Sequence, residues 1–182
     1  MGEKAVFRIL GIDPGTLQMG YGLIEATDGA DATVMAWGVI TASPRLPLGE
    51  RLHHMYLELV ELTQRHAPEE MAVEEPFVAK NVKTAMAVGQ AQGVALMAAA
   101  ARGITAVRYT PTQAKHAVTG YGGASKEQVQ QALVLHLRLD AIPEPEDAAD
   151  ALAVALCHCQ ALRIAALLEP ENLYDHLRPR NP

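Results

Sequence analysis

Cysteine is scarce in this chain of 182 residues, which contains only Cys157 and Cys159. Both fall in a stretch with helical character, where positions i and i+2 point apart. Neither a disulfide nor a chelating pair is therefore expected, and we predict ordinary core or boundary thiols. Free thiols suit a reducing compartment, so we expect a cytoplasmic protein.

Long uninterrupted apolar runs are also missing. Although 49% of the residues are apolar, every run of about 18 residues has charged or polar breaks, which predicts no membrane span. The opening MGEKAVFRIL lacks the pattern of a signal peptide. We expect one domain over residues 1–168, followed by a flexible tail over 169–182 that is rich in proline and charge.

Acidic residues are almost absent from the middle of the chain, although the net charge of the whole chain is −6. Between Phe77 and Arg138 there are seven lysines and arginines but one acid, Glu127, so this part carries +6 and the rest carries −12. A basic middle inside an acidic protein is compatible with a local face that binds polyanions. A solvated surface that happens to lack acids explains the same count.

Hydrophobic periodicity and turn residues predict the element order β-β-β-α-β-α-β-α-α-α. Asp28-Gly29 predicts a hairpin between the second and third strands, and Ser125 is a good N-cap. A strand meander followed by alternating helices and strands predicts a ribonuclease-H-like α/β domain. Its five-stranded sheet would be mixed, three antiparallel strands and then parallel ones, with helices on both faces. The expected strands cover 5–13, 19–26, 32–41, 71–73 and 104–109, and the expected helices 47–66, 82–102, 111–118, 126–138 and 146–168.

Two of the predicted strands end in acid. The apolar strand over 5–12 leads into Asp13, which Pro14 keeps extended, at the strand end where open α/β sheets place their chemistry. The fourth strand repeats this design in Val73-Glu74-Glu75-Pro76. If the two strands are parallel neighbours, one glutamate meets Asp13. Because successive strand residues point to opposite faces, only one of Glu74 and Glu75 can do so, and the residues alone leave the choice open.

A third acidic element is Asp147-Ala148-Ala149-Asp150, whose two carboxylates share one face near the start of a helix. An ordinary pair of first-turn acids on a solvated face explains the same pattern. Four converging carboxylates would repel one another unless cations lay among them, and oxygen ligands suit magnesium or manganese. Two such ions clamp the attacking and leaving oxygens of a phosphoryl displacement. Chemistry and spacing together predict a metal-dependent nuclease.

Four separated segments resemble, in the same order, the RuvC-type Holliday-junction resolvases (crossover junction endodeoxyribonucleases). They are GIDPGTLQMGYGLIE, VEEPFVAKNVKTAMAVGQAQGV, PTQAKHAVTGYGGASKEQVQ and DAADALAVALCHC, and the resemblance covers nearly all of residues 8–160. It implies a homodimeric endonuclease that nicks two opposed strands of a four-way DNA junction in recombination and repair. It also implies two Mg2+ ions per active site, which Mn2+ may replace, and RuvA and RuvB branch-migration proteins as partners.

The resemblance also implies roles for individual residues. It favours Glu74 over Glu75 as the acid that joins Asp13. In many family members the residue at the position of Glu75 is not acidic. Water activated by the metals would be the nucleophile, without a covalent intermediate. By motif, the catalytic residues are the metal ligands Asp13, Glu74, Asp147 and Asp150, together with Lys115 and Lys126 close to the scissile phosphate.

DNA contacts follow from the same resemblance. Phe77 would stack on an unpaired base, and Lys80 and Lys83 would hold backbone phosphates beside Lys115 and Lys126. Taken alone, Phe77 is typical of a core residue, and Lys83 of a solvent-facing charge. Gly89 and Gly93 each cost about 1 kcal/mol in a helix interior, which close packing would offset. That packing is either intramolecular or, as the resemblance favours, a two-fold dimer interface that includes Ala85.

Three other functions share parts of this pattern. An actin-like phosphotransferase or ATPase opens with a similar strand and an Asp-x-Gly-Thr turn, but it needs two lobes and a second phosphate loop. A related ribonuclease-H-like nuclease would act on another nucleic acid. A non-catalytic module would bind junctions or RNA, and its acids would be structural.

Overall fold

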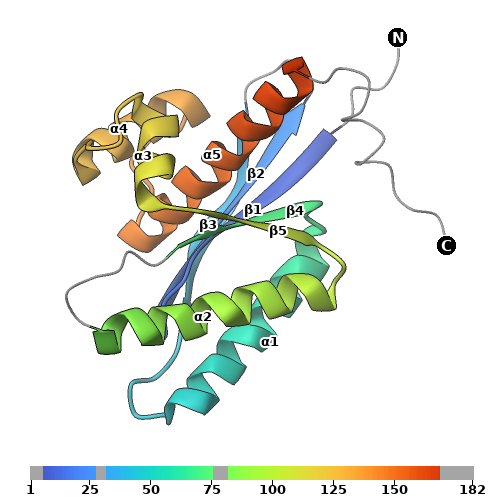
Figure 1. The fold of residues 1–182 in the computed structure, drawn as a ribbon, viewed down its shortest axis with the longest axis vertical. Helices are drawn as coiled ribbons and strands as arrows, with labels where there is room; N and C mark the ends of the chain where they lie inside the picture. Colours follow the sequence, from blue (N-terminus) through green and yellow to red (C-terminus); the bar gives the residue numbers. More distant parts are fainter. Residues whose placement is uncertain (1–5, 28–31, 76–81, 169–182) are drawn as a thin grey trace, which may run out of the picture.

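The computed structural model describes residues 6–27, 32–75 and 82–168 (Figure 1). They form a five-stranded sheet in the order β3-β2-β1-β4-β5, with helices on both faces. The predicted element order is confirmed, with small shifts at the element ends. The strands are β1 (Val6–Asp13), β2 (Gln18–Thr27), β3 (Thr33–Thr41), β4 (Glu70–Glu74) and β5 (Thr105–Tyr109), and the helices are α1 (Leu48–His66), α2 (Val82–Ala101), α3 (Pro111–Thr119), α4 (Lys126–Leu137) and α5 (Glu146–Leu168).

Strand pairing confirms the predicted mixed sheet. The first three strands form an antiparallel meander, whereas β4 runs parallel to β1 and β5 runs parallel to β4. The carboxyl ends of β1 and β4 therefore lie at the same sheet edge. Asp28 and Gly29 lie outside the described residues, as do residues 169–182, so the predicted turn and tail stay predictions.

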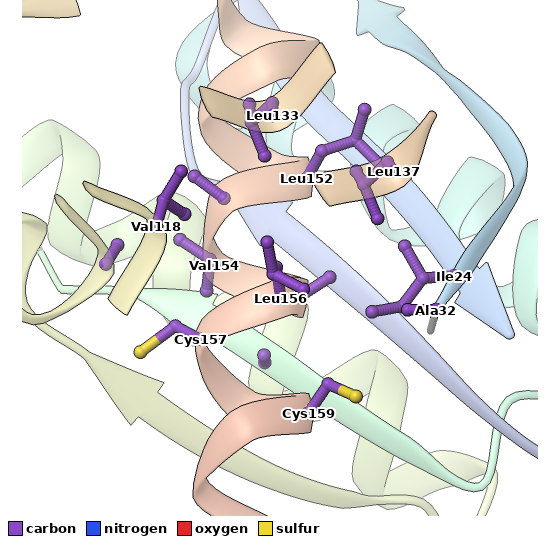
Figure 2. Packing of buried hydrophobic residues seen from close by; sticks show 14 of the residues in the cluster. Ile24, Ala32, Val118, Leu133, Leu137, Leu152, Val154, Leu156, Cys157 and Cys159 are labelled. Atoms are coloured by element: carbon purple, nitrogen blue, oxygen red, sulfur yellow. The ribbon is translucent and has the colours of Figure 1, made fainter. Parts of the chain in front are cut away.

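Alternation along the strands gives the sheet two apolar faces. On β1, Ile9 packs towards α5, whereas Leu10 and Ile12 pack towards α1 and α2. Figure 2 shows the first of these clusters, in which α5 carries apolar side chains towards α3, α4 and the sheet. Cys157 and Cys159 are buried free thiols in this cluster, as predicted.

Glycines in β1 and β2 let α5 lie directly on the sheet. A Cβ atom added to Gly11 would lie 2.0 Å from the carbonyl oxygen of Ala151, and one added to Gly20 would lie 1.9 Å from that of Asp147. Any side chain at these positions would push the helix away. Since Gly20 pairs with Asp13, this close approach brings the first turn of α5 over the end of β1.

Helices α2 and α5 are long and apolar enough to cross a membrane by length and composition alone. Core helices of globular domains pass the same test. Helix α5 is apolar because it lies between the sheet and helices α3 and α4. Its residues from Ala148 to Cys159 are all buried except the half-buried Asp150. Helix α2 packs on the opposite face and leaves several apolar side chains exposed, a feature that bears on assembly.

Candidate active site

The side chains of Asp13 and Glu74 meet at the end of the two central strands. The parallel pairing of Ile12 with Val73 places the following residues side by side. The Glu74 carboxyl group donates a hydrogen bond to Asp13. Burial is the largest cause that raises both pKa values above their ordinary range, and the charge of Asp13 raises that of Glu74 further. At neutral pH the pair therefore holds a proton.

Glu75 points away from this pair. Its carboxylate Oε1 lies 3.5 Å from Nε of Arg108, and its backbone N–H donates to the carbonyl oxygen of Tyr109 at 2.7 Å. Alternation along the strand thus decides what the sequence left open, because Glu74 is the glutamate that joins Asp13. Arg108, one of the cations of the basic middle, is engaged by Glu75.

Helix α5 brings two further acids to the same edge. The charges of Asp150 and Asp147 each raise the pKa of Asp13, after the larger effect of its burial. Burial also raises the pKa of Asp150, while the positive charge of Lys126 opposes that rise. The four predicted acids therefore interact electrostatically, and Asp147 and Asp150 are not simply acids on a solvated face.

Two lysines reach this edge from α3 and α4. Both helices begin with a capping box, formed by Thr110 with Gln113 and by Ser125 with Gln128, which confirms the predicted N-cap. These caps fix where the helices start and hence where their lysines project. A cavity of about 240 Å³ is lined by Glu74, Pro111, Ala114, Lys115, Lys126, Val129, Asp150 and Ala153.

Lys126 balances part of the acidic charge. Its Nζ lies 4.0 Å from Oδ2 of Asp150 and contacts the carboxylate of Glu146. The hydrogen bond with Glu146 is the largest cause that raises the pKa of Lys126. Sequence reasoning missed Glu146, although its place directly before Asp147 in the first turn of α5 was a usable signal.

The donor set of this site is made of carboxylate oxygens, which fit a hard divalent cation such as Mg2+ or Mn2+. Burial, and then the negative charge of neighbouring carboxylates, raises the pKa values of Asp13, Glu74 and Asp150, and a bound cation would favour their ionised forms. Within the described ranges, no three or more acidic, histidine or cysteine side chains gather closely enough to hold a metal ion as they stand. The carboxylates thus lie near one another and suit a divalent cation, but they do not surround a single metal position.

The remaining predicted site residues either lie on α2 or fall outside the described residues. Phe77 and Lys80 are outside the described residues. Lys83 is exposed in the first turn of α2, across the sheet from α5. Gly89 and Gly93 lie on the same helix, and a Cβ atom added to either would meet nothing within 4 Å among the described residues outside the local helix backbone. Close packing against the described residues therefore does not explain these two glycines.

Comparisons with known proteins agree with this geometry. The family model for crossover junction endodeoxyribonuclease RuvC matches residues 9–158. A protein of that name from Roseiflexus sp. strain RS-1 is 49% identical over 162 residues, which are 89% of this chain and 96% of the relative. Another from Pelotomaculum thermopropionicum is 50% identical over 150 residues, or 82% of this chain and 91% of the relative.

Solved structures show the same fold. T. thermophilus RuvC in complex with Holliday junction substrate superposes with a TM-score of 0.83 at 35% identity, covering 87% of this chain and 96% of that chain. The yeast mitochondrial Holliday junction resolvase Ydc2 superposes with a TM-score of 0.59 at 14% identity, covering 83% of this chain and 78% of that chain. The second likeness concerns the fold alone, and together they confirm the predicted ribonuclease-H-like architecture.

Proposed function

The chain belongs to the RuvC family of crossover junction endodeoxyribonucleases, and we propose that the four neighbouring acids at this sheet edge form the centre that hydrolyses junction DNA. It is a nuclease that resolves four-way (Holliday) junctions in recombination and repair. The observation that carries the catalytic proposal is the meeting of Asp13 and Glu74 at the sheet edge, where Glu74 lines one cavity with Asp150 of α5 and the two lysines.

Asp13, Glu74, Asp147 and Asp150 are the residues that would hold the metal, with Mg2+ as the physiological ion, Mn2+ as a substitute and two ions per active site. Bound divalent ions would polarise the scissile phosphate and its attacking water. The chain itself supplies the anionic oxygens on rigid elements, since two acids end strands and two lie on a buried helix. The proton held by Asp13 and Glu74 would leave when metal binds.

Lys115 and Lys126 would hold the phosphate group during the reaction. Both line the cavity beside Glu74 and Asp150, and each begins from a capped helix that fixes its backbone. An ammonium group placed there offsets negative charge that develops on the phosphate oxygens. Lys126 would have to leave Asp150 when that carboxylate binds metal, while Glu146 keeps the lysine nearby.

Family resemblance, rather than observed geometry, supports the remaining DNA contacts. Phe77 would stack on an unpaired base next to the crossover, and Lys80 and Lys83 would contact the phosphate backbone. Lys83 is exposed at the start of α2, where DNA can reach it.

Helix α2 is the proposed dimer interface. Its exposed side chains include Val82, Met86 and Met97, which are 71%, 65% and 63% exposed. Gly89 and Gly93, with Ala85 one turn before Gly89, leave room on this helix for close approach of a second copy. A two-fold dimer would present two sites to the two opposed strands of a symmetric junction. We further propose a cytoplasmic location and the RuvA and RuvB branch-migration proteins as partners.

The direct test compares a synthetic four-way junction with a linear duplex of the same sequence. With Mg2+ we expect paired nicks at symmetric positions in the junction and little cutting of the duplex, and with EDTA no cutting of either. Cleavage of both substrates alike would indicate a related nuclease of other specificity. Tight junction binding without any cleavage would indicate a binding module.

A further inference from the structure

A buried polar network joins α5 to β4 and β5, away from the acidic cluster. Its centre is His158 of α5, which is 2% exposed. Nε2 of His158 contacts the carboxylate of Glu70 in β4, and Nδ1 lies 2.8 Å from the hydroxyl oxygen of Tyr109 in β5. The side chain of Glu70 is itself only 15% exposed. None of these three residues has a part in the catalytic proposal.

Hydrogen bonding in this network is complete with a neutral ring. A His158 ring protonated on Nε2 donates to the Glu70 carboxylate, and its Nδ1 accepts the proton of the Tyr109 hydroxyl. Burial is the main cause that raises the pKa of Tyr109 to about 12, so the hydroxyl keeps its proton. A shift of α5 along its axis would break both hydrogen bonds and leave buried polar groups unpaired, which is destabilising.

The network lies on the same two elements as two of the proposed metal ligands. Glu70 and Glu74 begin and end β4, and His158 follows Asp150 along α5. Along the strand, Glu70 and Glu74 are separated by about 13 Å. Along the helix, Asp150 and His158 are separated by about 12 Å. Because these lengths match and the helix runs antiparallel to the strand, fixing His158 on Glu70 places Asp150 at the level of Glu74.

Apolar contacts also hold α5 on the sheet, because Ile9 and Ile24 pack in one cluster with Leu152 and Leu156 of the helix. Gly11 and Gly22 let the helix approach closely, and Leu152 occupies the space over Gly22. The hydrogen bonds at His158 add directional contacts, whose geometry is lost when the helix shifts along its axis.

We infer that His158 is a positioning residue, which acts through Glu70 and Tyr109 to hold Asp150 of α5 against Glu74 of β4. This inference rests on the proposed metal-dependent function. Tyr109 links this network to the site, because its carbonyl oxygen accepts a hydrogen bond from the N–H of Glu75, the residue after Glu74.

The test uses Glu70→Ala, which removes the hydrogen-bond acceptor of His158, and Glu70→Gln, whose amide oxygen still accepts a hydrogen bond from the imidazole ring. Cys159→Ala is the matched control, because it removes a buried side chain next to His158 without touching the network. Two quantities are measured on the whole protein. One is the affinity for Mn2+ without DNA, from the paramagnetic resonance signal of the free ion. The other is the Mg2+ dependence of cleavage at saturating junction.

Glu70→Ala is expected to weaken Mn2+ affinity about tenfold and to lower the cleavage rate about tenfold to a hundredfold. Glu70→Gln should stay within about threefold of the wild type for both, and Cys159→Ala should match the wild type despite a lower melting temperature. Wild-type affinity in Glu70→Ala, or equal losses in Glu70→Ala and Cys159→Ala, would overturn the inference. If the wild type cut no junction, the proposed function would fail, while the Mn2+ comparison would still decide the positioning role.

Discussion

Asp13 and Glu74 hold a proton between them because two buried carboxyl groups in contact cannot both ionise without a cation. Holding these two carboxyl groups together destabilises the folded protein while no metal is bound. The same arrangement suits a divalent cation, which would stabilise the ionised carboxylates. The charge of Lys126 lowers the pKa of Asp150, of Asp13 and of Glu74, and among the causes it ranks second at Asp150 but last at the other two.

Glu74→Gln should stabilise the metal-free protein at alkaline pH. The pKa of Glu74 is raised in the folded state above its ordinary value of 4.5. As the pH rises above that value, the unfolded chain ionises while the folded protein keeps its proton, so wild-type stability falls until the folded pKa is passed. Glutamine has no proton to lose. We expect the variant to gain about 1–3 kcal/mol at pH 9 and almost nothing at pH 4, measured by urea unfolding in EDTA.

The comparison at two pH values separates ionisation from packing. A gain of the same size at both would come from altered packing, and no gain at pH 9 would mean that Glu74 is not held protonated. Glu75→Gln is the control, because Glu75 faces Arg108 outside the pair.

At the scale of elements, the sequence predicted well wherever local pattern decides the structure. Capping residues and apolar periodicity gave the helices, and the acid-proline ends of two strands predicted the meeting of Asp13 with a glutamate. Choosing between Glu74 and Glu75 required the strand register, which the residues alone do not contain. The network around His158 was out of reach because Glu70 and His158 are 88 residues apart, and only packing brings them together.

Helix α2 yields a prediction about assembly. Met86 is 65% exposed in the face that contains Gly89. Met86→Asp should convert the proposed dimer into a monomer, because a buried unpaired charge costs far more than an apolar interface contact contributes. Sedimentation velocity measures the change. Leu135→Asp is the matched control, since Leu135 is 79% exposed on α4 across the sheet and should leave the dimer intact. Equal behaviour of both variants would contradict the α2 interface.

At the scale of the whole molecule, a chain with a net charge of −6 must still bind a polyanion. Binding of DNA then depends on where the lysine and arginine side chains lie and not on the net charge of the whole chain. Lys115 and Lys126 reach the site cavity, whereas Arg108 is engaged by Glu75, so the basic middle is not one uniform surface.

Junction affinity should fall steeply as salt concentration rises, because each phosphate contact releases counterions from the DNA. The logarithm of the binding constant should fall linearly with the logarithm of salt concentration, with a slope of about −0.9 per phosphate contact. Fluorescence anisotropy in EDTA measures binding without cleavage. Lys83→Ala should make this slope shallower by about one contact, whereas a flat response in the wild type would contradict binding through the basic middle.

The most direct test of the catalytic account is a pair of substitutions at the sheet edge, each of which replaces a carboxylate with an uncharged amide. Asp13→Asn removes an acid proposed to hold metal, while Glu75→Gln removes a neighbouring acid that faces Arg108. Junction binding and Mg2+-dependent cleavage are measured for both. Asp13→Asn should bind the junction like the wild type and cut it at least about a hundredfold more slowly, and Glu75→Gln should bind and cut normally. Cleavage by Asp13→Asn at the wild-type rate would contradict the account.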